Sequence, residues 1–302
     1  MNAISHKLTT LLKFSVLALL LIGGASAIWG ALLYFNLSTT SSVPWALPVL
    51  MASLWGLWSY LGGKGWPRST SYSRKRLLRA NKVSSAVFTW SLIAGALAMV
   101  SLAGLWIVLF QLFPMHGNPL LPQNFTSSPL LIAAMVIGAS LLAPIVEESA
   151  IRGYLQTALE REFRPVTAIL LSSAVFAIVH LTQGLAWPKL MLYFLVGITF
   201  GSLAFLSDSI LPVIAVHIPA DLIFFLFVWP NDSGRQLVWQ TGADSWFWFH
   251  IAQFVILSGL SLIAFRKLRQ LRNNSLASQN RAGLPDEAAF QHAFTACDHA
   301  RL

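Results

Sequence analysis

The chain has 302 residues, of which 56% are hydrophobic and only 10% are charged. A soluble domain carries about 25% charged residues, so this composition excludes an ordinary soluble protein. The net charge of +9 does not indicate nucleic-acid binding, because the basic residues lie between hydrophobic segments, where they are typical of a membrane topology signal. A single cysteine, Cys297, excludes an internal disulfide framework.

Eight apolar segments predict eight membrane-spanning helices, because a run of about 20 apolar residues crosses the hydrocarbon core of a bilayer. In chain order they are residues 14–36, 44–63, 84–113, 129–150, 166–183, 189–207, 210–229 and 247–265. The third is longer than one upright crossing needs, so we expect it to tilt or protrude. The predicted fold class is all-α, a polytopic membrane helical bundle.

The first segment also imitates a signal peptide. A basic start and an apolar run are followed by Ala25, Ser26 and Ala27, which resemble a cleavage site. The apolar run continues through residues 28–35, however, and this favours an uncleaved membrane anchor.

The basic residues predict the orientation of the bundle. If the N-terminus is cytoplasmic, only Lys189 and Arg235 of the 20 lysines and arginines fall on the opposite side. The reverse orientation breaks the positive-inside rule at nearly every loop. We therefore expect both termini in the cytoplasm.

Ionisable residues are costly inside a bilayer, so those within the spans point to function. Nearly all of them lie in three short segments, residues 147–152, 176–180 and 217–221. Each segment falls in a different predicted span, and this joint occurrence is more informative than any one residue.

Helical spacing gives each segment a geometry. Glu148 and Arg152 are four residues apart and share a helix face, with the acid N-terminal to the base. Glu147 lies about 100° around the helix and is free to point elsewhere. Two further pairs are also four residues apart, Phe176 with His180 and His217 with Asp221.

The depths of three of these side chains agree. The fourth and fifth helices must turn near residues 163–165, and Glu147 and His180 lie 17 and 16 residues from Arg164. At about 1.5 Å per residue, both stand about 25 Å from the turn. His217 reaches this depth if the charged hairpin tip protrudes into the cytoplasm. We expect one carboxylate and two imidazoles to converge inside the membrane.

This set suits peptide hydrolysis. A buried glutamate can act as general base on water, and a histidine can polarise a carbonyl or stabilise an oxyanion. Two histidines and a carboxylate can equally bind zinc. Each residue also has a structural interpretation: Glu148 and Arg152 as an ion pair, the histidines as helix–helix hydrogen-bond partners, Phe176 as core packing and Asp221 as a proton relay.

The order and spacing of these residues resemble the CAAX-protease/bacteriocin-processing (CPBP) family of intramembrane proteases, which includes CAAX prenyl protease 2 and lysostaphin-resistance-like proteins. The family pattern is two glutamates followed by arginine, then Phe-x-x-x-His, then His-x-x-x-Asn or Asp. The flanking residues agree: Ala143-Pro144, Gly153-Tyr154 and Leu211-Pro212. The resemblance spans about residues 130–225.

The resemblance implies an all-helical membrane endopeptidase. Glu147 is then the general base, with His180 and His217 positioning water or substrate. The supporting residues are Glu148, Arg152, Phe176 and Asp221, the last replacing the commoner asparagine. The implied partners are the lipid bilayer and a membrane-embedded or membrane-proximal peptide or protein substrate, and the compact chain favours a bacterial inner membrane.

Members of the family have been described both as metalloproteases and as metal-independent glutamic proteases. A zinc ion would use Glu147, His180 and His217. The sequence has no His-Glu-x-x-His motif, which argues against the zincin arrangement. We favour the glutamic mechanism, with no cofactor required.

These observations divide the chain into regions. They are an N-terminal membrane region 1–128 with a basic cytoplasmic loop 64–85, a CPBP-like catalytic core 129–230, a last span 231–265 and a polar cytoplasmic tail 266–302. In the tail, His292, Cys297 and His299 are interpreted as incidental residues rather than a metal cluster.

Two other functions stay open. The same fold can serve a catalytically inactive membrane immunity or scaffold protein. Alternatively, the polar residues can form the relay of a proton-coupled transporter, although transporters usually contain repeated halves and the sequence has no evident repeat.

Overall fold

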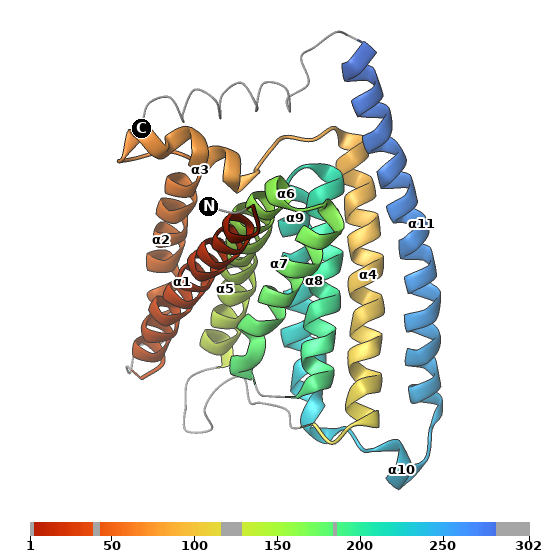
Figure 1. Cartoon of the computed structure of the whole chain (residues 1–302). Helices are drawn as coiled ribbons and strands as arrows, with labels where there is room; N and C mark the ends of the chain where they lie inside the picture. Colours follow the sequence, from red (N-terminus) through yellow and green to blue (C-terminus); the bar gives the residue numbers. More distant parts are fainter. Residues whose placement is uncertain (1–2, 39–42, 116–128, 184–185, 282–302) are drawn as a thin grey trace.

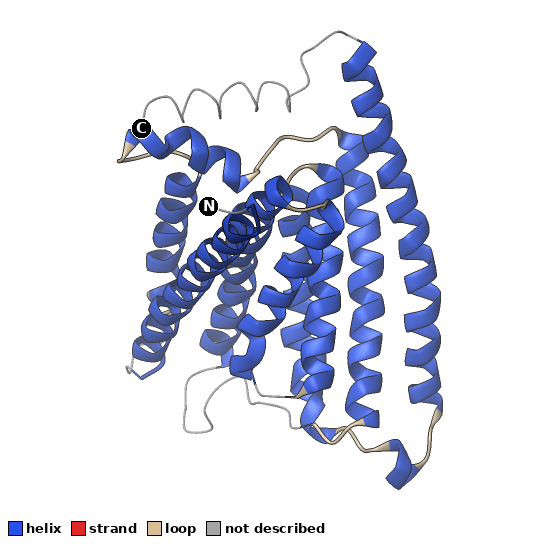
Figure 2. Cartoon of the chain, in the orientation of Figure 1, coloured by secondary structure: helices blue, strands red, loops and turns tan. Residues whose placement is uncertain are grey.

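The computed structural model of the chain describes residues 3–38, 43–115, 129–183 and 186–281 (Figure 1). Within these ranges every regular element is a helix (Figure 2). The α-helices are α1 (Ala3–Ser38), α2 (Ala46–Leu61), α3 (Ser71–Leu78), α4 (Ser85–Leu112), α5 (Pro129–Glu147), α6 (Thr157–Glu162), α7 (Pro165–Val179), α8 (Trp187–Ser207), α9 (Leu211–Ile223), α10 (Val238–Thr241) and α11 (Ser245–Arg281). The π-helical segments are η2 (Glu148–Gln156) and η4 (Phe224–Val228), and the 3-10 turns are η1 (Arg68–Thr70), η3 (His180–Gln183) and η5 (Trp229–Gly234).

Six helical segments of the described chain are long and apolar enough to cross a membrane, and α2 and α7 are shorter apolar helices. Each of the eight predicted spans corresponds to one of these helices. The predicted all-α membrane bundle is confirmed, and the chain is an integral membrane protein.

The first and last long helices of the described chain, α1 and α11, are longer than predicted. α1 begins at Ala3 rather than at residue 14, and α11 continues to Arg281 rather than ending at residue 265. The added residues include lysine, arginine, leucine and glutamine, which are good helix formers. These helices therefore extend past the apolar stretch into polar surroundings.

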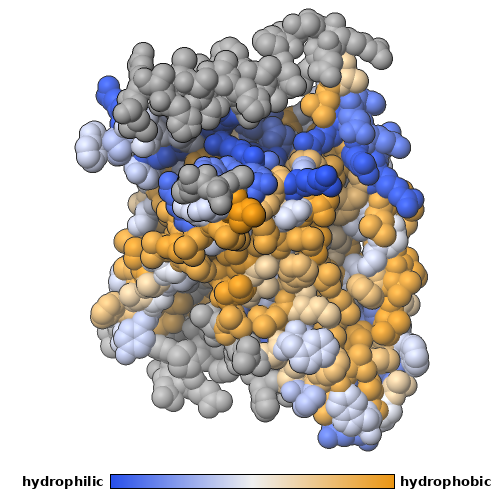
Figure 3. Space-filling view, viewed as in Figure 1, coloured by the Kyte–Doolittle hydropathy of each residue, from blue (hydrophilic) through white to orange (hydrophobic). Residues whose placement is uncertain are grey.

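The surface is divided into layers. On the face shown in Figure 3 a broad hydrophobic belt covers the middle of the bundle, and hydrophilic residues gather at the end of the molecule that carries α3 and the end of α11. The start of α1 lies toward the same polar end (Figure 1). The start of α1 and the end of α11 lie toward one end because an even number of membrane crossings returns the chain to the side from which it started.

Proline residues set the starts of the inner helices. Pro165, Pro188 and Pro212 each lie in the first turn of α7, α8 or α9, where the missing N–H has no helical partner to lose. The predicted turn at residues 163–165 is confirmed, because α6 ends at Glu162 and α7 begins at Pro165.

The helix that carries the two glutamates is not regular. Pro144 lies inside α5, and from Glu148 the helix widens into the π-helical segment η2. In a π-helix each turn holds more residues than in an α-helix, because the hydrogen bonds join residues five apart. The four-residue spacing of the polar residues predicts a regular α-helix here, and the π-helical segment corrects that expectation.

The inner helices pack around η2. α7 and α8 lie side by side, α5 packs against α9, and α4 lies between α8 and α11. η2 contacts α1, α7 and α8. The polar residues of η2 are therefore placed at the centre of the bundle, away from lipid.

Candidate active site

The centre of the site is a buried cluster of three charged or ionisable side chains. Glu148 Oε1 lies 3.3 Å from an Nη atom of Arg152 and accepts a hydrogen bond from His217 Nδ1 at 2.9 Å. Glu148 and Arg152 are fully buried, and His217 is 5% exposed. The expected pairing of Glu148 with Arg152 on one helix face is confirmed, and α9 adds the histidine.

His217 lies between two carboxylates. Its second ring nitrogen, Nε2, is 3.3 Å from Oδ1 of Asp221, one turn further along α9. This confirms that the two side chains share a face. Both ring nitrogens can donate at once only when the imidazole carries two protons. The two carboxylates therefore fix the orientation of the ring.

Arg152 is enclosed by rings and backbone. Its guanidinium lies 4.2 Å from the ring centre of Phe176 and 5.4 Å from that of Phe200. One Nη atom donates to the carbonyl oxygen of Gly197, at 3.5 Å. These contacts hold the cation against aromatic faces, where the ring quadrupole attracts it.

His180 is positioned from the end of α7. Its Nδ1 donates to the carbonyl oxygen of Phe176 at 2.8 Å, and its ring lies 4.6 Å from the Phe176 ring. The other face of His180 stacks on Tyr193 with 4.0 Å between ring centres. When Nδ1 carries the proton of a neutral ring, Nε2 is an acceptor.

Glu147 is placed differently from its neighbour. Both ion pairs of the cluster use Glu148, and within the described part of the chain Glu147 has only longer-range electrostatic interactions, with His217, Asp221, Glu148 and Arg152. Its side chain is half-buried. The structure thus brings His217 into direct contact with the second glutamate, and the expected convergence of Glu147 with His180 and His217 stays a prediction.

A largely apolar cavity of about 300 Å³ adjoins this cluster. Its polar lining comes from His180, Tyr193, His217, Asp221 and Gln253, and the rest is almost entirely apolar. Helix α4 supplies one wall, from Met99 to Ile107. The two histidines therefore line a cavity that is suited to apolar side chains.

The two histidines differ in the ring nitrogens that a metal ion could use. Both nitrogens of His217 face carboxylate oxygens, whereas Nδ1 of His180 donates to a backbone carbonyl and leaves Nε2 as an acceptor. Among the described residues no group of three or more His, Cys, Asp or Glu side chains is arranged to hold a metal ion. The tail residues His292, Cys297 and His299 lie outside the described part of the chain.

The helical membrane bundle thus contains a buried cluster of Glu148, Arg152 and His217, with His180 beside the adjoining cavity. Residues 129–223 match the family model of Rce1-like type II CAAX prenyl endopeptidases. Comparisons with curated proteins and with solved structures gave no significant match. The resemblance to the CPBP family is confirmed over this region, which has the fold of a CAAX-type intramembrane protease and contains all three polar segments.

Sequence reasoning missed several residues that shape the site. Tyr193 stacks on His180, Phe200 lies 4.5 Å from the ring of His217, and Gln156 donates to the Gly201 carbonyl at 2.9 Å. Gln156 lies four residues after Arg152, so extending the four-residue spacing would have found it. Tyr193 and Phe200 carried no signal, since aromatic residues in an apolar span are most simply packing.

Proposed function

We propose that the protein is an intramembrane endopeptidase that hydrolyses peptide bonds of membrane-associated proteins or peptides. The observation that carries the proposal is the position of His217. It is held between Glu148 and Asp221 and lines, together with His180, an apolar cavity. The match of residues 129–223 to an endopeptidase family supports the same activity.

In the proposed reaction Glu147 is the general base. It accepts a proton from a water molecule while the water oxygen attacks the carbonyl carbon of the scissile bond. Nε2–H of His217, which lies 3.3 Å from Asp221 and lines the cavity, turns to the negative oxygen of the tetrahedral intermediate and stabilises it. The proton then passes from Glu147 to the leaving amine nitrogen as the carbon–nitrogen bond breaks.

Glu148 and Arg152 act in this scheme through His217. The 2.9 Å hydrogen bond from Nδ1 fixes the ring, and Arg152 neutralises the carboxylate that accepts it. Asp221 restrains the second nitrogen from within the cavity lining. Because the site is preorganised, little energy is lost in aligning these groups during the reaction.

The substrate is proposed to be an apolar segment lying beside α4. The cavity wall formed by α4 and Val196 and Phe224 offers apolar contacts, and the two histidines and Asp221 lie at its polar part. An unwound stretch of a membrane peptide could place side chains against the wall and a carbonyl near the imidazoles.

We further propose that the enzyme needs no metal. The glutamic mechanism uses Glu147 as the base, and His217 is already engaged on both sides by carboxylates. Turnover should therefore persist in excess chelator. Activity that chelators abolish and zinc restores would overturn this part of the proposal.

The test is cleavage of membrane peptides by the purified chain in lipid nanodiscs, with products identified by mass spectrometry. New peptide termini should form with the wild type and be lost with Glu147→Gln, His180→Ala and His217→Ala. A folded wild type without peptidase activity would favour a scaffold protein, and proton-coupled flux without cleavage would favour a transporter. Comparing membrane peptides from cells that carry wild type or Glu147→Gln would identify the substrate.

A further inference from the structure

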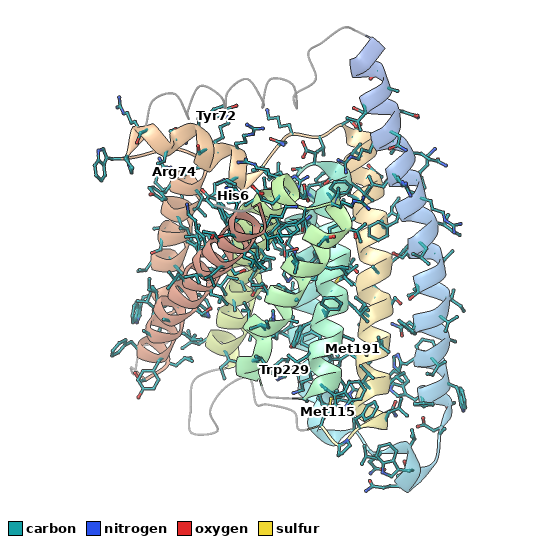
Figure 4. The ribbon with its side chains drawn as sticks, viewed as in Figure 1. His6, Tyr72, Arg74, Met115, Met191 and Trp229 are labelled. Carbon is teal, nitrogen blue, oxygen red and sulfur yellow. The ribbon has the colours of Figure 1, made fainter. Side chains whose placement is uncertain are left out.

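A second site is suggested by the segment between α2 and α4, which we term the interfacial loop (residues 62–84). It lies at the polar end of the molecule, where Figure 4 places Tyr72 and Arg74 on α3. Trp66 and Tyr72 are 86% and 67% exposed. Exposed basic residues accompany them: Lys64, Arg68, Lys75 and Lys82. This mixture of aromatic and basic side chains is typical of a segment at the membrane surface.

A cavity of about 230 Å³ lies between this loop and the end of α2. Lys64 and Lys75 line it together with Ser59, Asn81 and the ring of Trp58. The lining has two ammonium groups and no carboxylate. The nearby acids Glu160 and Asp208 are both paired with Arg79. The cavity is therefore positively charged and suited to an anion.

The loop is held in shape before any ligand binds. Arg74 is 6% exposed, donates to the carbonyl oxygens of Gly65 and Pro67, both at 3.3 Å, and lies 4.0 Å from the ring centre of Tyr60. The backbone N–H of Lys64 donates to the Ser59 carbonyl at 2.9 Å. These contacts fix the backbone that carries Lys64.

Arg74 adds charge beneath the loop. Among the described residues no carboxylate forms an ion pair with it, and its Nε and one Nη atom are buried without a hydrogen-bond partner. A buried cation without a counter-ion is costly. An anion bound near this loop would lower that cost through its charge.

The position of the cavity indicates which kind of anion it would bind. Ser59 and Gly62 line it, and Met51 and Trp55 precede them on the same helical face of α2. Met51 and Trp55 are 49% and 71% exposed, and the helix that carries them is apolar. A ligand with a charged head at the lysines and an apolar body along α2 fits both surfaces.

We infer that this cavity binds the headgroup phosphate of an anionic phospholipid, with its acyl chains along Met51 and Trp55. Lys64 and Lys75 bind the phosphate as mobile point charges, a common role of lysine. The site is separate from the candidate active site, and the inference does not depend on peptidase activity.

The test measures bound lipid by native mass spectrometry. The full chain, delipidated in detergent, is mixed with equal amounts of phosphatidylglycerol and phosphatidylcholine. The wild type should retain phosphatidylglycerol preferentially. Lys64→Gln/Lys75→Gln should weaken this binding roughly 30-fold, as expected for two basic residues at a membrane surface. Lys64→Arg/Lys75→Arg should retain it and show that the fold tolerates both substitutions.

The matched control is Lys267→Gln/Arg269→Gln, which removes two exposed basic residues from α11. It should bind phosphatidylglycerol like the wild type. Equal losses in the two glutamine variants would overturn the inference, because binding would then follow overall charge. Displacement of the lipid by millimolar inorganic phosphate would also overturn it, since the cavity would then be a site for free anions.

Discussion

Two neighbouring glutamates have different surroundings. Glu148 is fully buried, with Arg152 and His217 as partners, whereas Glu147 is half-buried and interacts only at longer range within the described residues. The four-residue spacing predicted the pairs Glu148–Arg152 and His217–Asp221 because both are local. The contact of His217 with Glu148 joins residues 69 apart in sequence, and it depends on which faces of α9 and η2 meet, which spacing cannot provide.

This difference predicts that replacing each glutamate with glutamine affects stability at one position and activity alone at the other. Glu148→Gln leaves the buried cation of Arg152 without its carboxylate, and breaking such a pair costs about 3–5 kcal/mol. Glu147→Gln should leave the unfolding midpoint in detergent unchanged and lower peptidase activity about 10²–10⁴-fold, the usual contribution of a general base. Thermal unfolding and peptide cleavage measured on both variants check this. Equal destabilisation by the two substitutions would contradict the assignment.

At the scale of elements, the π-helical segment η2 carries a row of buried polar residues that α6 continues. Glu148, Arg152 and Gln156 lie four residues apart on η2, and the partly buried Glu160 follows on α6. The carbonyl oxygens of Gly197 and Gly201 on α8 accept hydrogen bonds from Arg152 and Gln156. The sequence predicted the helices, but not the widened turn, because apolar periodicity does not distinguish α from π geometry over nine residues.

Close approach of α8 to α7 predicts a glycine requirement. A Cβ atom at Gly197 would lie 2.8 Å from Cβ and 2.9 Å from Cα of Ser173, so backbone would have to move. Gly197→Ala should destabilise the protein by about 1–3 kcal/mol, as overpacking does. Gly259→Ala is the control, because nothing lies within 4 Å of its added Cβ, and it should be neutral or stabilising. Similar unfolding midpoints for the two variants would be the contrary result.

At the scale of the whole molecule, Arg79 joins the N-terminal region to the core. Its guanidinium pairs with Glu160 of α6 at 3.0 Å and with Asp208 after α8 at 2.9 Å. Burial lowers the pKa of Arg79, but the two carboxylates outweigh burial and raise the pKa above its ordinary value. Arg79 and Asp208 both have left-handed backbone, with φ of 54° and 52°. The ion pair thus offsets two unfavourable conformations.

Removing this link should loosen the polar end of the bundle. Arg79→Gln cannot pair with two carboxylates at once, and we expect a loss of stability on the order of 2 kcal/mol. Hydrogen exchange should rise at Arg79–Asn81 and at Ser209–Ile210, since Ile210 N–H donates to the Arg79 carbonyl and Ser209 Oγ to that of Asn81. Arg76→Gln, on the same segment, is the control. Unchanged exchange in the Arg79 variant would show that the link is dispensable.

The predicted orientation of the bundle rests on the distribution of its lysines and arginines along the sequence. Of the 20 basic residues only Lys189 and Arg235 were predicted on the non-cytoplasmic side. In the structure both side chains are shielded from solvent. Lys189 is 4% exposed and lies 5.4 Å from the ring centre of Phe110, and Arg235 pairs with Asp232 at 3.0 Å. The positive-inside rule counts the lysines and arginines in the loops, so the prediction rests on the 18 basic residues of 20 that do not lie at that end.

We accordingly expect both termini in the cytoplasm of a bacterial cell, with the interfacial loop on the same side. Reporter fusions after residues 40, 75, 120 and 270 should read outside, inside, outside and inside. The fusion after residue 75 is the most informative, because it tests the loop that carries Lys64, Lys75 and Arg79. A periplasmic signal there, or after residue 270, would reverse the bundle and place the proposed phospholipid site in the opposite leaflet. Agreement at all four positions would show that Lys64 and Lys75 bind a phospholipid of the cytoplasmic leaflet.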